Sequence, residues 1–429
     1  MSTTLFRNLA LFTPVDGGCP ARGARQNQLH VVQDGALLVR DGQILAAGAR
    51  RDIERAAFSD ETCDLNGRCV IPGFVDPHTH LCFAARRENE FRMRLEGRTY
   101  LEILAQGGGI LSSVRAVMEA SDEALLATTR ANATSALCHG TTTLEVKSGY
   151  GLDLDTELRM LRVIKRLGET MPLDVAPTFM GAHAVPPRYK EHPDDYVREL
   201  IEVMLPAVAN ANLARFCDVF CEKGVFSVAQ SRAILLAAKQ LGFALKVHAD
   251  EVHDLGGAML AAEVGAISAE HLLAAADEGL AAMGKAGTVA VLLPATAYSL
   301  RKPYARGRAI IAMETPVALA TDCNPGSCFC ESMPFVMGLA IMAMDLTPEE
   351  ALTACPLNAA YAIGMADRVG SLEVGKQADF LVLDCESPAG VAYHAGANPV
   401  VAVYKRGVNV AREGRMLQAP FPPERSYVL

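Results

Sequence analysis

The chain has 429 residues, half of them hydrophobic, and a net charge of −9. This length allows a large buried core, and the negative charge argues against nucleic acid, whose phosphates need a basic face. No apolar run reaches the 18 or so residues that cross a bilayer, and the first residues lack a secretory signal's apolar segment. The twelve cysteines contain no C-x-x-C pair, so we expect buried thiols in a cytoplasmic protein.

The two ends of the chain have the pattern of β-strands. The stretch "GALLVRDGQILAAGA" has two alternating runs joined by Asp41-Gly42, which is a hairpin signal. Near the other end, "ADFLVLD" and "VVAVYKRGVNVAREG" are also strand-like, with a turn at Arg406-Gly407. Neither end is long enough for a stable sheet alone. We therefore expect residues 1–68 and 366–429 to form one small β-sandwich domain together.

Eight β-rich runs alternate with helical patterns between these ends. They are Cys69–Val75, Thr141–Val146, Leu173–Phe179, Phe216–Cys221, Ala244–Val247, Ala266–Ala269, Thr288–Leu293 and Val317–Ala320. Such alternation predicts an α/β fold, a (β/α)8 TIM-like barrel over residues 69–365. A doubly wound open sheet is the alternative, but no G-x-G-x-x-G motif follows an early run.

Two of the helical segments carry clear start signals. Ser227 and Gln230 form a capping box before an apolar segment that closes at Gly242. Thr347 has the position of an N-cap, with Pro348 at N1 and Glu350 at N3. These signals support helices between the predicted strands.

Polar side chains gather where the predicted strands end. Active sites of such barrels lie at the carboxyl ends of the strands. Most of the eight runs end in a candidate group there: His78 and His80, then Glu145, Lys147 and Tyr150, then His183, His248, His271 and Asp322. Each could be a structural polar residue by itself, but their shared position on one rim predicts a functional site.

Four of these residues form a set suited to a metal. His78, His80, His248 and Asp322 offer three nitrogens and one oxygen, which fit Zn²⁺ or Fe²⁺. A divalent ion lowers the pKa of water from 15.7 to about 7. We expect a single ion, because these four ligands suffice for one.

Three further residues are candidates for supporting roles around the ion. Glu251, three residues after His248, could move the proton of the attacking water, and His271 could polarise a carbonyl or hold that water. Lys147 could bridge two metals if carboxylated, but a structural or secondary role is the simpler expectation.

The chain resembles the amidohydrolase superfamily and, within it, is similar to the imidazolonepropionases. The superfamily resemblance rests on "PGFVDPHTH", "HADE", "SAEH", "ATD" and "GSLEVGKQADFLVLD". The narrower one rests on "HTHLCFAARRENEFRMRLEGRTYLEILAQGGGI", "EVKSGYGL", "GAHAVPP" and "ATDCNPGS". The resemblance implies a metal at the same four ligands. It also implies hydrolytic opening of 4-imidazolone-5-propanoate to N-formimidoyl-L-glutamate in histidine degradation.

The resemblance also implies substrate contacts and a homodimer. The contacts are Arg87, Tyr150, His183, Glu251, Asn324, Gly326 and Ser327. From their places around the ion, we expect Glu251, His271 and Asp322 to be the catalytic groups. A bidentate fork from Arg87 suits the propionate tail, although the residues alone do not decide between Arg86 and Arg87. The loop "NPGS" would offer backbone N–H groups to a carboxylate. The alternatives are a deaminase of a guanine-like heterocycle and a scaffold without catalysis.

Overall fold

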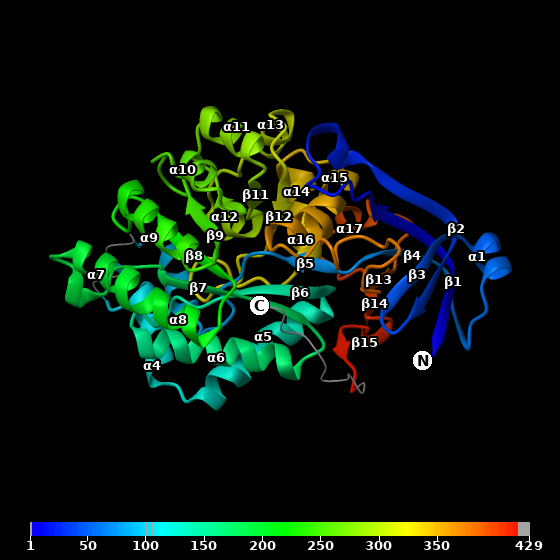
Figure 1. Cartoon of the computed structure of the whole chain (residues 1–429), viewed down its shortest axis with the longest axis horizontal. Coiled ribbons are helices and arrows are strands. Elements are labelled where there is room, and N and C mark those ends of the chain that lie inside the picture. Colours follow the sequence, from blue (N-terminus) through cyan, green and yellow to red (C-terminus); the bar gives the residue numbers. More distant parts are fainter. Residues whose placement is uncertain (1, 99–101, 104–105, 419–429) are drawn as a thin grey trace.

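Two eight-stranded sheets organise the computed structural model, which describes residues 2–98, 102–103 and 106–418 (Figure 1). One sheet is a nearly closed barrel whose parallel strands β5 to β12 follow one another in chain order. Its strands are β5 (Phe74–Asp76), β6 (Thr141–Lys147), β7 (Asp174–Ala182), β8 (Phe216–Cys221), β9 (Ala244–Ala249), β10 (Ser268–His271), β11 (Val289–Leu292) and β12 (Val317–Leu319).

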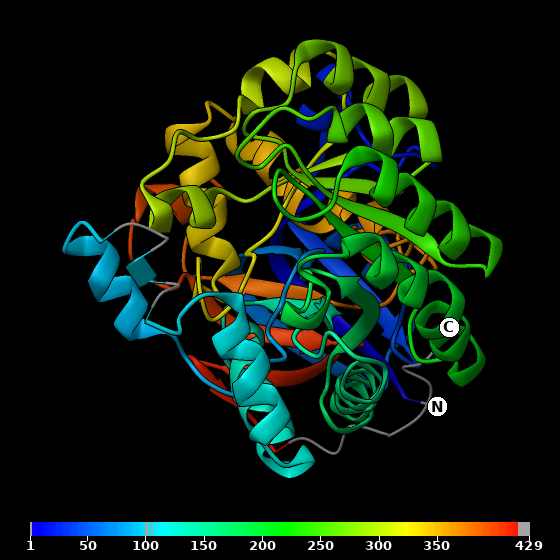
Figure 2. The ribbon, with the colours of Figure 1, turned by 90° about the vertical axis from the view of Figure 1, so that its left-hand side faces the viewer.

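Helices surround the barrel on its outer face, as the rotated view shows (Figure 2). The larger ones are α2 (Glu88–Leu95), α4 (Ile110–Glu119), α5 (Asp122–Cys138), α6 (Leu154–Thr170), α9 (Val228–Gln240), α10 (Gly257–Val264), α11 (Asp277–Ala286) and α14 (Met333–Ala343). Shorter ones are α7 (Pro193–Glu199), η3 (Leu200–Met204), α8 (Leu205–Ala211), α12 (Pro294–Leu300), α13 (Gly307–Ala312), α15 (Pro348–Thr353), η4 (Ala354–Asn358) and α16 (Ala359–Ala362). The capping box predicted for α9 is confirmed, and α15 has the predicted N-cap at Thr347, with Pro348 at N1 and a capping box between Thr347 and Glu350.

The second sheet joins both ends of the chain in the order β16-β15-β14-β13-β4-β1-β2-β3. Its strands are β1 (Thr3–Pro14), β2 (Leu29–Arg40), β3 (Gln43–Ala49), β4 (Glu61–Pro72), β13 (Phe380–Leu383), β14 (Val400–Lys405), β15 (Val408–Arg412) and β16 (Arg415–Met416). Strands from both chain ends therefore form one continuous eight-stranded sheet, and not the two separate sheets of a β-sandwich. The short elements η1 (Gly23–Asn27), η2 (Pro187–Tyr189), α1 (Arg50–Ala56) and α17 (Gly390–Tyr393) complete the chain.

Both predicted hairpin turns are confirmed. Asp41 and Gly42 join β2 to β3 with φ values of 52° and 79°, and Arg406 and Gly407 join β14 to β15 with 50° and 75°. Positive φ at both central residues is the geometry that a two-residue hairpin needs.

The first predicted barrel run was wrong in its extent. Residues 69–72 belong to β4, which pairs with β1 and β13 in the second sheet, and the barrel strand β5 begins only at Phe74. Gly73 separates the two, and a Cβ there would lie 2.4 Å from Thr142 Oγ1. We therefore propose Gly73 as the start of the barrel domain. Residues 419–429 of the proposed C-terminal part lie outside the described residues.

The barrel closes at a seam between β12 and β5, where no ladder pair joins the two strands among the described residues. The Thr321 backbone N–H and hydroxyl donate instead to the Asp76 carboxylate, at 3.1 and 2.6 Å. Just beyond the strands, the Asp322 N–H donates to the His78 carbonyl at 3.1 Å and the His80 N–H to the Cys323 carbonyl at 2.9 Å. Side chains and loops therefore hold this seam.

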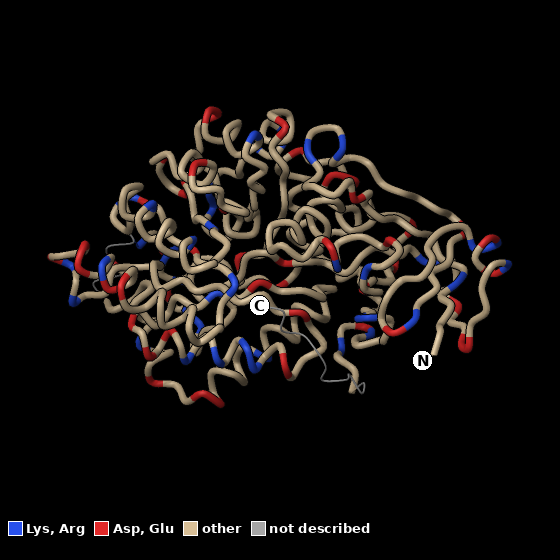
Figure 3. The backbone as a smooth tube through the Cα atoms, viewed as in Figure 1, with Lys and Arg blue, Asp and Glu red and all other residues tan. Residues whose placement is uncertain are grey.

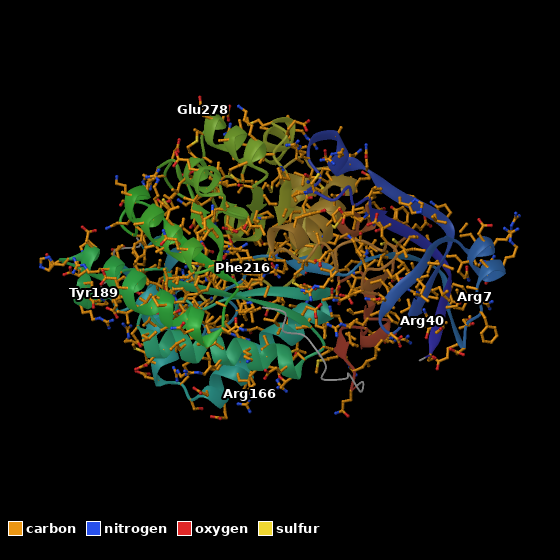
Figure 4. All side chains as sticks on the ribbon, viewed as in Figure 1. Arg7, Arg40, Arg166, Tyr189, Phe216 and Glu278 are labelled. Carbon is orange, nitrogen blue, oxygen red and sulfur yellow. The ribbon has the colours of Figure 1, made fainter. Side chains whose placement is uncertain are left out.

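The barrel interior is filled, and its charges lie mostly outside. Phe216 is fully buried and belongs to one apolar cluster with Ala176, Val289 and Ala359 (Figure 4). Positively charged lysines and arginines and negatively charged aspartates and glutamates are scattered over the outline of the molecule (Figure 3). The buried charges within the barrel are therefore exceptions that require a local reason.

Candidate active site

The four predicted metal ligands lie together at the carboxyl ends of the barrel strands. His78 and His80 follow β5, His248 lies in β9 and Asp322 follows β12, and all four are buried. The His80 and His248 Nε2 atoms are 3.1 Å apart. Asp322 Oδ1 lies 3.5 Å from His78 Nε2 and 3.7 Å from His80 Nε2.

The arrangement fits a divalent metal ion. Ligand atoms about 2.0–2.1 Å from a tetrahedral Zn²⁺ are roughly 3.3 Å from one another, close to the observed separations. Both ring nitrogens of His78 lack a hydrogen-bond partner, as does Nδ1 of His80, although these atoms are buried. Buried polar atoms are normally paired. Of these atoms, His78 Nε2 faces the Asp322 carboxylate, so it is a nitrogen that an ion would use.

His248 is oriented by Asp218, a residue that sequence reasoning missed. The His248 Nδ1 lies 3.1 Å from Asp218 Oδ1, which leaves Nε2 to face the other ligands. Burial would lower the pKa of His248, but the Asp218 carboxylate outweighs it and raises that pKa. Asp218 stands in the apolar run "FCDVFC", and a single acid inside a buried strand was the available signal.

Lys147 lies next to Asp218, at the carboxylate oxygen that His248 does not contact, and is fully buried. Its Nζ is 2.8 Å from Asp218 Oδ2 and 2.6 Å from Glu145 Oε1. Burial would lower the pKa of the ammonium, but the Asp218 and Glu145 carboxylates raise it overall. A charged lysine held by two carboxylates supports the structural role proposed for Lys147.

His271 and Glu251 stand beside the ligand set. The His271 Nε2 lies 3.7 Å from Glu251 Oε2, and the His271 ring is centred 5.2 Å from that of His248. Burial lowers the pKa of His271 to about 4 and raises that of Glu251 to about 7. The Glu251 side chain keeps 18% exposure. A neutral imidazole therefore lies beside a carboxyl group able to gain or lose a proton near neutral pH.

Two of these residues have strained backbones. Asp322 has a φ of 54° and His271 a φ of 72°, in the left-handed backbone region that residues other than glycine rarely adopt. Such strain gathers at functional sites, where the surrounding structure holds it. Asp322 is also fixed by the Thr296 hydroxyl, which donates to Oδ2 at 2.6 Å. Thr296, on α12, was not predicted, because no motif marks it.

His183 and Tyr150 form an aromatic wall next to His80. The His183 ring stacks on that of His80 with centroids 4.9 Å apart, and the Tyr150 ring lies 5.3 Å from His183. His183 Nδ1 is 3.0 Å from the Gly149 carbonyl. Burial lowers the pKa of His183 to about 3, so the ring is neutral at pH 7. Nδ1 then donates to Gly149, and Nε2 is left as an acceptor.

A cavity of about 260 Å³ is formed by the loop after Asp322, by the start of α2 and by both candidate arginines. It is lined by Arg86, Arg87, Glu88, Phe91, Arg94, Ser299, Pro325, Gly326, Ser327 and Phe329. Arg86 is exposed and stacks over Phe329 at 4.6 Å, whereas the Arg87 side chain is only 15% exposed. A Cβ on Gly326 would lie 2.4 Å from Arg87 Nη1. The geometry thus favours Arg87 over Arg86 as the less exposed cation, which could bind an anionic group in the cavity.

The "NPGS" loop differs from the expectation of free amides. Asn324 Oδ1 accepts the backbone N–H groups of Gly326 and Ser327 at 2.8 and 2.7 Å. The expectation that these amides are open to a carboxylate was therefore wrong for this structure, because an asparagine readily satisfies amides two and three residues ahead. Asn324 Nδ2 also donates to the Asp322 carbonyl at 2.7 Å, which ties the loop to a metal ligand.

Comparison with known proteins identifies the family. The model of the amidohydrolase family matches residues 69–410. The chain is 58% identical over 409 residues to an imidazolonepropionase from Syntrophobacter fumaroxidans, which covers 95% of this chain and 96% of that protein. A second imidazolonepropionase, from Desulfotalea psychrophila, is 57% identical and covers 96% of this chain and all of that protein. The chain belongs to the imidazolonepropionase family of amidohydrolases. It is a metal-dependent hydrolase.

Solved structures agree with this assignment at the level of the fold. An adenosine deaminase from Xanthomonas campestris with bound zinc has a TM-score of 0.70 at 18% identity, covering 97% of this chain and 94% of that one. A guanine deaminase from E. coli has a TM-score of 0.69 at 14% identity, covering 96% and 99%. At such identities the likeness shows the fold alone, whereas the imidazolonepropionase family is shown by sequence identity above one half. Over the described residues, no helix has the length and apolarity of a membrane span.

Proposed function

We propose that this chain hydrolyses 4-imidazolone-5-propanoate to N-formimidoyl-L-glutamate, with water attacking the ring carbonyl. One observation carries the proposal: His271 and Glu251 lie beside His78, His80, His248 and Asp322, whose closest facing atoms are 3.1–3.7 Å apart pairwise between His80 and His248 and between Asp322 and both His78 and His80. The names of relatives that are more than half identical to this chain supply the substrate. His78, His80, His248 and Asp322 would hold the metal, which when bound makes water acidic and polarises a carbonyl.

Glu251 would move the proton between water and ring. A carboxyl group with a pKa near 7 can accept a proton from the attacking water and release it to the departing ring nitrogen. The C–N bond of the cyclic amide breaks as that nitrogen gains the proton. The carbonyl carbon keeps the water oxygen and becomes the second carboxylate of the product. Asp322 could share this proton traffic, because burial raises its pKa as well.

His271 would stabilise the negative charge on the carbonyl oxygen. The neutral ring, with its low pKa, can donate one N–H without becoming charged itself. Tyr150 and His183 would receive the flat imidazolone ring, since both present an aromatic face and a polar atom next to His80. These contacts would fix the ring carbonyl toward the metal ligands.

Arg87 would bind the propionate tail. Its Nε and Nη2 already donate to Glu90, at 2.9 and 2.7 Å, so the edge formed by Nη1 and Nη2 remains for a carboxylate. A guanidinium offers two such edges, each able to make a bidentate pair. Asn324 holds the amides of Gly326 and Ser327 and also the Ser327 hydroxyl, at 2.9 and 3.1 Å, so these groups would have to exchange Asn324 for the substrate carboxylate. Gly326 would allow the loop to approach Arg87 closely.

The decisive assay follows the ultraviolet absorbance of synthetic 4-imidazolone-5-propanoate. We expect wild-type turnover, loss of activity and of bound metal in His248→Ala, and a raised KM in Arg87→Ala. The Arg86→Ala variant is the matched control and should keep its KM within about twofold. Unchanged turnover by His248→Ala would refute the metal-based mechanism. Release of ammonia from guanine would favour the deaminase alternative.

The native metal, the compartment and the assembly are further proposals. Three nitrogens and one oxygen suit both Zn²⁺ and Fe²⁺, and we propose that one of these is the native ion. Metal analysis of the protein purified without added metal would distinguish them. We also propose a cytoplasmic homodimer, in line with the family resemblance. Cell fractionation and sedimentation velocity test these two points.

A further inference from the structure

Glu90, a residue of α2 without a role in the mechanism above, is held at an unusually well-defined position. It is buried, with 8% of the residue exposed, and its carboxylate accepts the two donors of Arg87. It also accepts the Gly109 N–H at 3.0 Å and lies 3.3 Å from the Ser112 hydroxyl, which shares its proton with the Gly109 carbonyl at 2.9 Å. Burial would raise the pKa of Glu90, but the hydrogen bonds from Arg87 outweigh it, so the carboxylate stays ionised.

These bonds decide which edge of Arg87 is left for a further partner. Glu90 occupies the edge formed by Nε and Nη2, and Arg87 Nη1 lies against Gly326. Gly109 and Ser112 lie at the start of α4, so the carboxylate is anchored from two helices at once. Arg87 therefore cannot rotate about its last torsions without breaking a bidentate ion pair.

We propose that Glu90 is a positioning residue that turns the free edge of Arg87 toward the carboxylate of the substrate. It thereby makes the enzyme selective for imidazolones with an anionic tail. The inference rests on the proposed function, because it assumes that Arg87 binds that tail. Glu90 touches neither the substrate nor the metal ligands in this arrangement, and it acts through Arg87.

Two effects of Glu90 oppose each other, which makes the test sharp. Its negative charge weakens the attraction of Arg87 for another carboxylate, so its removal would lower KM if charge dominated. Its two acceptor oxygens fix the guanidinium, so its removal would raise KM if orientation dominated. Orientation should win, because a bidentate pair with a misaligned guanidinium loses both of its hydrogen bonds.

The test compares kcat and KM for two substrates, the imidazolone propionate and its propanamide analogue, in wild type and Glu90→Gln. Glutamine keeps the shape but has a single acceptor oxygen. We expect KM for the propionate to rise about tenfold, kcat to stay within about twofold, and KM for the amide to change little. The effect should vanish in an Arg87→Gln background, because the two residues act as one unit.

Glu96→Gln is the matched control. It removes another Arg–Glu pair of the same helix region, with Arg92 at 3.0 Å, but this pair is exposed and lies outside the cavity lining. Its kinetic constants should equal those of wild type. Should Glu90→Gln fold poorly, Ser112→Ala weakens the same anchor and should raise KM for the propionate in the same direction, by a smaller factor.

The outcomes separate the two levels of the proposal. A wild-type enzyme that turns over neither imidazolone would refute the proposed function itself. Turnover of both substrates, with an equal KM change for propionate and amide or a lower KM for propionate in Glu90→Gln, would overturn the positioning role and leave the function standing.

Discussion

Glu251 is the residue whose chemistry depends most on its surroundings. Burial raises its pKa to about 7, so the carboxyl group is poised between its acidic and basic forms at neutral pH. Replacing it with glutamine keeps the size and removes the titration. We expect Glu251→Gln to lower kcat by about 10²–10⁴-fold, the usual contribution of general acid–base catalysis. Metal content should stay at the wild-type level, and a variant that retains full kcat would contradict the assigned role.

Asp218 should matter for metal affinity because it orients His248 from behind. Groups that hold a ligating histidine are worth about 10–100-fold in metal affinity. We expect Asp218→Asn to lose affinity by such a factor, measured by competition with a chelating dye. Asp195→Asn is the control, since Asp195 forms only an exposed ion pair with Arg198. Equal metal affinities in the two variants would contradict a role of Asp218 in orienting His248.

The predicted ligands and the missed residues differ in how they reach the site. His78, His80, His248 and Asp322 were predictable because each follows or ends a strand, and strand ends converge on one rim of a barrel. Asp218, Thr296 and Glu90 act through another side chain, so they need no fixed position relative to a strand end. Only the fold shows what they contact, and of the three the sequence marks only Asp218, as a single acid inside an apolar run.

Among the elements, the strands of the barrel were predicted well and the passage between the two sheets was not. The run from Cys69 to Val75 is apolar apart from Pro72-Gly73, and this Pro-Gly pair is the signal in the sequence that could have divided β4 from β5. The division falls at Gly73, where the backbone lies against Thr142. That close approach is a tertiary contact, which the Pro-Gly pair alone does not reveal.

Gly73→Ala should therefore destabilise the joint between the sheets. The added Cβ would meet Thr142 Oγ1 at 2.4 Å and its Cγ2 at 2.6 Å, and overpacking of this kind costs about 1–3 kcal/mol. The expected result is a lower urea midpoint for unfolding. Gly338→Ala controls for the loss of a glycine, because the nearest heavy atom outside its own helix lies 3.9 Å from its Cβ position, an ordinary van der Waals distance. A loss in Gly338→Ala as large as that in Gly73→Ala would contradict the packing argument.

For the whole molecule, a buried ion-pair cluster connects the sheet of the chain ends to the barrel. Lys405, at the end of β14, is fully buried and lies 2.7 Å from Asp174 of β7 and 2.6 Å from Asp379. Arg406 adds a second contact to Asp174 at 3.0 Å. The cluster unites residues more than 200 positions apart in the sequence. Such pairing across domains could not be predicted from local pattern.

Lys405→Met should weaken the whole molecule, because it leaves two buried carboxylates with less compensation. Removing one partner of a buried ion pair costs about 3–5 kcal/mol. Unfolding in urea should show this loss, whereas Arg68→Met, which breaks the exposed pair with Asp384, should cost at most about 1 kcal/mol. Equal stability of the two variants would show that the buried ion-pair cluster does not stabilise the protein.

The seam between β5 and β12 has a consequence for how long the enzyme survives in a cell. His78 and His80 stand on one side of this joint and Asp322 on the other, so an ion held by all three would bridge it. Binding to the folded state alone stabilises a protein by mass action. Without metal, the backbone amides of Thr321 and Asp322 should thus be the first to exchange faster with solvent, which hydrogen–deuterium exchange can measure. The barrel should then become more susceptible to proteolysis at this seam. Metal supply would then set the abundance of the enzyme as well as its rate.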